Sequence, residues 1–242
     1  MRRKSLLIAL GLVVFLAGSA CGTMVILLRH EPSFYHQADI PPGAYRERQA
    51  RECLRKLTDL YNGVSNQDAT WGEALTADEV NSYLTEDFLR PTSLLNETML
   101  PEGFHAPRVA IEPNRVRLAM RYGTGTWSTI VSFDLRVWLV AKQTNTVAIE
   151  MQGFQAGSLP ITPQSLLEHI SEAARPLNIE VNWYRHRGNP VALVRLQADQ
   201  PEPTLQLRRL RITQGQIAVE GRSLVDSPRP AASSLSLKPN AE

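Results

Sequence analysis

Hydrophobic residues follow three different spacings along this chain. From Leu6 to Leu28 an apolar run continues without a charged residue. Between residues 43 and 90, apolar residues recur every three or four positions, which is typical of amphipathic helices. From residue 109 onward they mostly alternate with polar residues, as in strands with one buried face. The order predicts a membrane helix, then helices, then a sheet.

The first run is long enough to cross a bilayer. At about 1.5 Å per helical residue it reaches roughly 35 Å, more than the ~30 Å hydrocarbon core. Three basic residues precede it and only Arg29 follows closely, which predicts a cytoplasmic N-terminus and an extracytoplasmic remainder. We interpret residues 1–28 as a basic head and an uncleaved single-pass anchor in the plasma (inner) membrane. Two alternatives stay open: a signal peptide cleaved after Ser19-Ala20, and a lipid on Cys21.

Two helices are predicted ahead of the sheet. Residues 29–42 are polar and carry three prolines, which indicates a short tether. The first helix covers residues 43–61, with an apolar stripe formed by Ala50, Cys53, Leu54, Leu57, Leu60 and Tyr61. Its arginines alternate with acidic residues, which favours a solvated face over contact with lipid headgroups. The second helix begins at Thr76, where Thr76 and Glu79 match a capping box, and stops at Pro91.

The strands are expected after an irregular segment at residues 91–107. The longest alternation runs from Trp127 to Val140, longer than most strands, which predicts a curved or bulged strand. A third helix is predicted between Thr162 and Pro176, because Pro163 suits the first helical position. Alternation breaks between Leu207 and Leu210, which predicts a bulge at Arg208-Arg209.

The predicted fold class is therefore α+β. It consists of the N-terminal transmembrane helix, then an antiparallel curved β-meander of about seven or eight strands with two preceding helices and one inserted helix. The extracytoplasmic domain spans residues 43–225. Residues 226–242 are rich in Ser, Pro and Ala, and are predicted to be a disordered tail.

Charge and cysteine content limit the partners. All 24 acidic residues and all but three of the 26 basic residues follow the apolar run. The domain is therefore nearly neutral, and no nucleic-acid partner is expected. Cys21 lies inside the apolar run and Cys53 outside it, so no disulfide within the domain is expected.

Motifs for catalysis are not found in the sequence. The five histidines are scattered without the spacing of metal ligands, and no Gly-x-Ser-x-Gly turn or phosphate-binding glycine loop occurs. Cys53 falls on the apolar stripe of its helix, where a thiol is buried and unreactive. We predict a non-enzymatic protein without a metal or cofactor.

The long alternating strand and its successor supply the best candidate binding surface. Their shared apolar face either is filled as core or leaves a groove that suits an acyl chain. The residues of this candidate groove are Phe133, Leu135, Val137, Leu139, Val147, Ile149 and Met151.

Two short segments resemble parts of a known family. Leu75–Leu84 (LTADEVNSYL) is similar to the "LT-x-E-x-LN-x-L" helix start, and Gly153–Ile161 (GFQAGSLPI) to the "G-x-LP" crossover, of small bacterial envelope proteins with one N-terminal anchor and a tubular lipid-binding (TULIP-like) domain. The final hairpin with Gln214-Gly215 also fits. The resemblance implies binding or passage of lipids in the cell envelope, without catalysis.

Two function classes follow. The first is a membrane-anchored, extracytoplasmic protein that binds a hydrophobic ligand, expected to be lipid. The second is an envelope scaffold with a solid core, which docks a protein partner through a sheet edge or the arginine-rich first helix. A continuous apolar cavity favours the first class, whereas a solid core with an apolar surface patch favours the second.

Overall fold

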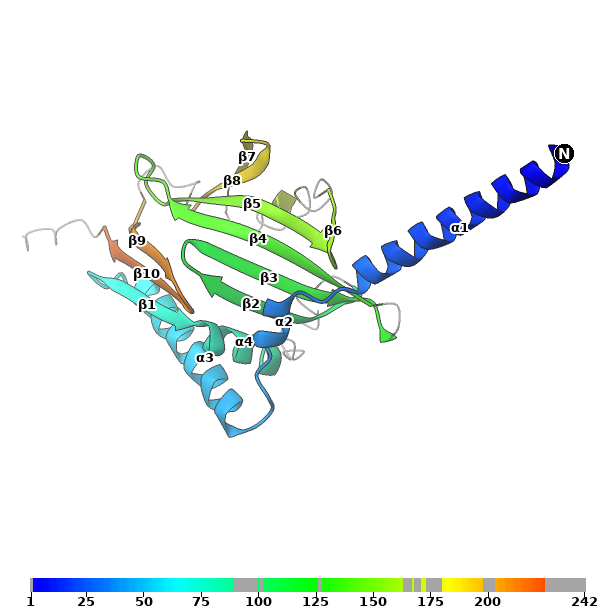
Figure 1. Ribbon diagram of the computed structural model, residues 1–242. Helices are drawn as coiled ribbons and strands as arrows, with labels where there is room; N and C mark the ends of the chain where they lie inside the picture. The colour runs from blue at the N-terminus through cyan, green and yellow to red at the C-terminus, as the bar shows by residue number, and fades with distance from the viewer. Residues whose placement is uncertain are drawn as a thin grey trace, which may run out of the picture.

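The computed structural model describes residues 2–88, 100, 102–125, 128–162, 167, 171–172, 180–197 and 203–224, with the side chains of residues 2–11, 13 and 14 outside the description. The predicted α+β class is confirmed. The helices are α1 (Arg2–Arg29), α2 (Ser33–Gln37), α3 (Ala44–Ser65) and α4 (Ala77–Glu86). Figure 1 shows α1 projecting away from the domain that the other elements form.

The larger sheet has seven antiparallel strands. Its order is β2-β3-β4-β5-β8-β7, and the short β6 pairs with β5 beside this path. The bounds are β2 Phe104–Glu112, β3 Arg115–Tyr122, β4 Thr129–Leu139, β5 Thr146–Ala156, β6 Leu159–Pro160, β7 Glu180–His186 and β8 Asn189–Arg195. β8 takes the place beside β5 that β7 would occupy in a simple meander.

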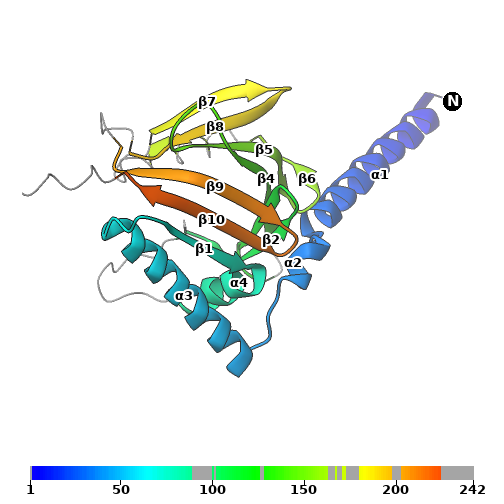
Figure 2. The ribbon, with the colours of Figure 1, turned by 90° about the vertical axis from the view of Figure 1, so that its left-hand side faces the viewer.

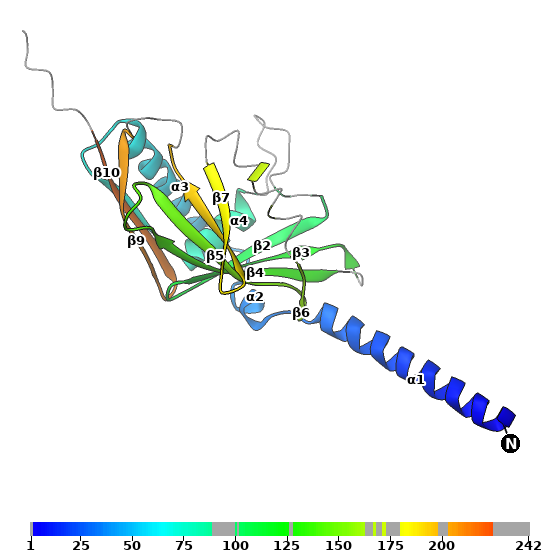
Figure 3. The same cartoon turned by 90° about the horizontal axis from the view of Figure 1, so that it is seen from above.

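A second, three-stranded sheet corrects the prediction of one meander. β9 (Leu205–Thr213) and β10 (Gln216–Ser223) do not continue the larger sheet; they pair with β1 (Trp71–Thr76) in the order β1-β10-β9. β1 was missed because it is only six residues long and runs directly into α4. Figure 3 shows this small sheet and α1 at opposite ends of the large sheet.

One of the two predicted strand irregularities is confirmed. In the β4–β5 pair, Asp134 faces Gly153 and Leu135 faces Met151, so the extra residue is Gln152 of β5 and the bulge is not in the long strand β4. In the β9–β10 pair, Glu220 faces Arg209 and Gly221 faces Leu207, so Arg208 is the extra residue of a bulge. The bulge accompanies a close contact, because a Cβ on Gly221 would lie 2.2 Å from the Trp71 ring.

The prediction of an irregular segment at residues 91–107 is wrong for residues 104–107. β2 already begins at Phe104 and contains a register shift between His105 and Arg108. Ala106 has a φ of 48°, which interrupts the extended backbone. The alternation of apolar and polar residues is broken there, and the start of the strand could not be recognised from the sequence. Most of residues 91–103 lie outside the described residues. The same holds for most of the predicted third helix, of which only Leu167, Ser171 and Glu172 are described as helical.

The capping box at the start of α4 is confirmed. The Thr76 side chain accepts from the Glu79 N–H at 3.2 Å, and Glu79 accepts from the Thr76 N–H at 2.8 Å. Glu79 is buried and also binds Lys56 of α3 at 2.7 Å. This ion pair joins the two helices through the cap.

The apolar stripe of α3 is narrower than predicted. Ala50 and Cys53 are buried, but Leu54 is 46% exposed and Tyr61 is 71% exposed. α3 packs against α4 and β1, and this contact covers only one side of the helix. The helix also continues past Asn62-Gly63 to Ser65, where the structure ends it one turn later than the glycine predicts.

Two asparagine amides join the layers by imitating a strand partner. Asn81 of α4 donates to the Val109 carbonyl at 2.8 Å and accepts from the Val109 N–H at 2.7 Å. Asn145, in the β4–β5 turn, donates to the Leu205 carbonyl at 2.7 Å and accepts from the Leu207 N–H at 2.8 Å. The first attaches α4 to the edge of β2, and the second attaches β9 to the large sheet.

The segment predicted as a tether, residues 29–42, is docked on the sheet. α2 lies across β2 and β3 (Figure 1), and its Phe34 and Tyr35 are buried. The Arg108 guanidinium lies 4.4 Å from the Tyr35 ring centroid, and that of Arg117 lies 4.8 Å from Phe34. Burial raises the pKa of Tyr35, whose hydroxyl donates to the Ala106 carbonyl at 2.9 Å. Aromatic rings stacked on guanidinium groups thus replace the solvated chain expected from the prolines.

The last turn of α1 is hydrogen-bonded to the large sheet where β4 begins and β5 ends. The Ser158 N–H donates to the Leu27 carbonyl at 2.8 Å, and the Thr129 hydroxyl donates to the Leu28 carbonyl at 2.5 Å. In the part of the chain that the structure describes, no helix is long and apolar enough to span a membrane. The anchor at residues 1–28 therefore stays a prediction.

Candidate functional site

The large sheet has one face on which apolar side chains continue from strand to strand. Residues directly opposite in a ladder point to the same face. Leu118 faces Phe133 across β3 and β4, and Leu135 faces Met151 across β4 and β5. Ile149 then faces Ala192 of β8, which faces Trp183 of β7. The pairing therefore extends the apolar face over five strands.

A pocket of about 300 Å³ opens on this face. All ten lining residues are hydrophobic: Leu118, Met120, Phe133, Leu135, Ile149, Met151, Val181, Trp183, Ala192 and Val194. Phe133 also stacks on Phe154 with ring centroids 4.8 Å apart. The volume lies at the lower end of the range for small-molecule sites, and the wall presents hydrocarbon rather than polar groups.

The candidate groove is only partly the same as this pocket. Four of its residues line the pocket: Phe133, Leu135, Ile149 and Met151. Val137, Leu139 and Val147 lie further along the same paired strands and are outside the lining.

Sequence reasoning missed the pocket residues of the other strands. Leu118 and Met120 belong to an alternation visible in residues 116–122, and Val181 and Trp183 to another at the start of β7. Those patterns show that each strand has an apolar face. They do not show that β8 and β7 bring this face beside β5.

The one polar atom of the lining side chains has its own partner. The Trp183 indole N–H donates to the Ser171 hydroxyl at 2.8 Å. Leu167, four residues before Ser171, packs against the cluster of Val131, Phe133 and Met151. Two described residues from the predicted third helix thus contact this face, and a ligand in the pocket would meet only apolar surface.

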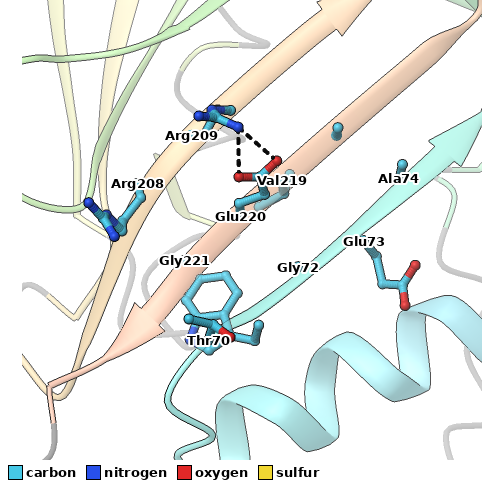
Figure 4. Close-up of a pocket in the computed structure, with 11 residues that line it drawn as sticks. Thr70, Gly72, Glu73, Ala74, Arg208, Arg209, Val219, Glu220 and Gly221 are labelled. Atoms are coloured by element: carbon cyan, nitrogen blue, oxygen red, sulfur yellow. Dashed lines mark hydrogen bonds and ion pairs between the residues drawn. The ribbon is translucent and has the colours of Figure 1, made fainter.

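A larger cavity of about 760 Å³ lies over the three-stranded sheet, and its polar groups do not converge (Figure 4). Arg209 is paired with Glu220 at 3.0 Å, whereas Arg208 and Glu73 point in different directions. An exposed Arg209–Glu220 pair and diverging charges provide little to orient a ligand.

A third cavity, of about 300 Å³, lies between α2 and β3–β5, beside Arg115 and Arg117. Arg115 is bound to Asp134 and Arg117 to Glu112. The positive charges that would hold an anion are therefore already paired.

The described residues contain no group of three His, Cys, Asp or Glu side chains that could hold a metal. Cys53 is buried, as its place on the apolar stripe predicts. Burial, with a smaller contribution from the negative charge of Glu79, raises the pKa of its thiol to about 11. The thiolate, which is the nucleophilic form, is therefore scarce near neutral pH.

Comparison with known proteins leaves the candidate pocket as the main guide to function. No family model matches the chain, and neither does any curated protein or solved structure. The resemblance to TULIP-like envelope proteins stays a prediction.

Proposed function

We propose that this chain is a membrane-anchored, extracytoplasmic, non-enzymatic protein that binds a hydrophobic ligand, with lipid acyl chains as the ligand class. The observation that carries the proposal is the pocket on the large sheet, because its ten lining residues are all hydrophobic. Such a wall cannot orient a polar substrate by hydrogen bonds, but it accepts hydrocarbon. Each ligand methylene removed from water contributes about 0.8 kcal/mol, before the cost of ordering the chain.

The N-terminal helix supports a site at a membrane. Its described apolar side chains before Leu27 are exposed, with Phe15 at 70% and Ile26 at 71%, so the domain does not bury them. A contiguous apolar surface of this kind needs another apolar environment, and a bilayer provides one. The hydrogen bonds of Leu27 and Leu28 to the sheet hold the domain directly at the end of that helix.

Native mass spectrometry of the full chain tests the ligand. The protein is extracted in detergent, released from the micelle in the spectrometer, and compared with Leu135→Trp and Leu139→Trp. Leu135 lines the pocket, whereas Leu139 lies on the same strand and face beyond it. We expect bound lipid masses on the wild type and on Leu139→Trp, and their loss from Leu135→Trp.

Thermal unfolding of both variants separates filling of the pocket from unfolding of the domain. The proposal fails if the wild type carries no lipid after incubation with an envelope lipid extract. It also fails if both folded variants retain lipid equally.

The scaffold alternative has one observation in its favour. Leu54 and Tyr61 are exposed on the outer side of α3, seven positions apart and hence on one helix face. If this face docks an envelope protein, Leu54→Asp with Tyr61→Asp would remove a crosslinked partner from membranes without changing lipid retention. If the crosslinking pattern is unchanged, the scaffold role through α3 is excluded.

A further inference from the structure

The β7–β8 hairpin points toward the end of the sheet from which α1 leaves. β5 runs from Thr146 to Ala156, and the turn that follows it is bonded to Leu27. β8 is antiparallel to β5, with Arg195 opposite Thr146 and Val191 opposite Glu150. The hairpin turn that precedes β8 therefore lies toward the α1 end. Figure 2 shows its tip on the same side of the molecule as α1.

The tip of this hairpin is basic and exposed. Arg185, His186 and Arg187 are all exposed, and Tyr184 before them is 41% exposed. The turn itself is tight, because Arg187 and Gly188 have φ values of 52° and 89°. Among the described residues, no ion pair or side-chain hydrogen bond is found for Arg185 or Arg187. The tip thus presents two arginines whose charges are not neutralised by the described part of the domain.

We propose that the tip of the β7–β8 hairpin, Tyr184 to Gly188, docks on anionic lipid headgroups of the membrane that holds α1. The inference rests on the proposed membrane anchor. Guanidinium groups bind phosphate oxygens through paired donors, and basic segments near a membrane are attracted to anionic lipids. Tyrosine is favoured at the boundary between headgroups and hydrocarbon, which suits Tyr184.

The same hairpin connects this contact to the pocket. Its strands contribute Val181, Trp183, Ala192 and Val194 to the lining, whereas Arg185, near the end of β7, and Arg187, in the turn, lie at the tip. A tip seated on headgroups therefore holds one wall of the pocket beside the bilayer. That arrangement would let an acyl chain reach the pocket without crossing bulk water.

Hydrogen exchange of the full chain in lipid nanodiscs tests the contact. Discs of phosphatidylcholine alone are compared with discs containing phosphatidylglycerol as the anionic lipid. We expect amides of residues 184–189 to exchange about fivefold or more slowly in the anionic discs. The variant Arg185→Glu with Arg187→Glu should lose that protection.

The matched control is Arg208→Glu with Arg211→Glu, which makes the same charge change on β9. Both arginines are exposed and lie on the small sheet, at the opposite end of the large sheet from α1 (Figure 3). We expect this variant to keep the protection of residues 184–189. Equal loss in the two variants would show an effect of net charge and overturn a specific contact of the hairpin.

The other results also decide the proposal. Equal exchange of the hairpin in the two kinds of disc overturns the docking, even when the protein enters the discs and retains lipid. Failure of the wild type to enter discs overturns the anchor and the docking together. Loss of lipid retention with an intact hairpin response removes only the proposed role of the pocket.

Discussion

Replacing Gly157 by alanine should release the end of α1 from the sheet. Gly157 follows β5 with a φ of 60°, a conformation that costs a residue with a Cβ about 1–2 kcal/mol. Its Cβ would also lie 2.2 Å from the Leu27 carbonyl oxygen and 2.5 Å from that of Leu28. Real Cβ contacts do not become this short, so the backbone of α1 has to move.

The expected cost follows from the bonds at this junction. Moving α1 breaks the bond from Ser158 to Leu27 and that from Thr129 to Leu28, each contributing about 0.5–1.5 kcal/mol. Together with the strained φ, we expect the free energy of unfolding to fall by about 2–5 kcal/mol. Gly215→Ala is the control, because Gly215 has a φ of 71° and open space around a Cβ. It should cost only the conformational part, about 1–2 kcal/mol.

Urea unfolding of the full chain in detergent, followed by tryptophan fluorescence, measures both free energies. Hydrogen exchange reports the Ser158 amide separately, and we expect this amide to lose protection only in Gly157→Ala. Equal destabilisation by the two substitutions, with the Ser158 amide still protected, would refute the docking of α1. The domain would then have no fixed orientation relative to the proposed anchor.

Two further predictions concern buried polar groups. Asn81→Asp keeps the acceptor for the Val109 N–H but loses the donor to the Val109 carbonyl and buries a charge, so it should lower the free energy of unfolding by about 1–3 kcal/mol. The control Asn62→Asp changes an exposed asparagine and should stay within about 0.5 kcal/mol of wild type. Equal effects of the two substitutions would contradict the paired hydrogen bonds between Asn81 and Val109. With Cys21 replaced by serine, Cys53 should alkylate very slowly at pH 8, because a pKa of about 11 leaves roughly one thiol in a thousand ionised. The same raised pKa means that the thiol favours folding below about pH 8.5 and that this contribution is lost as the pH rises toward 11. Alkylation at the rate of a free cysteine would show that Cys53 is not buried.

Features that depend on a few neighbouring residues could be predicted from the sequence. The capping box needs only Thr76 and Glu79, three positions apart, and the structure forms both of its hydrogen bonds. The bulge at Arg208 appears as a single break in alternation, and the register confirms it. The buried position of Cys53 follows from helical spacing in the same way.

Features that depend on partners far away in the sequence could not be predicted from it. Phe34 and Tyr35 stand in a polar, proline-containing segment, and their burial requires Arg108 and Arg117 from strands far along the chain. β1 becomes a strand through its pairing with β10, near the end of the domain. In both cases the local pattern is too short to reveal an interaction that long-range packing creates.

The sequence by itself determined the α+β class, the position of most strands and the existence of an apolar face on β4 and β5. Only the tertiary structure decided that a second sheet forms, that α2 covers the arginine-bearing strands, and that Trp183 lies in the same pocket as Leu118. The physical reason is that alternation tells which side chains share a face of one strand. It contains no information on which strand lies beside it, or on whether the face is covered or left open.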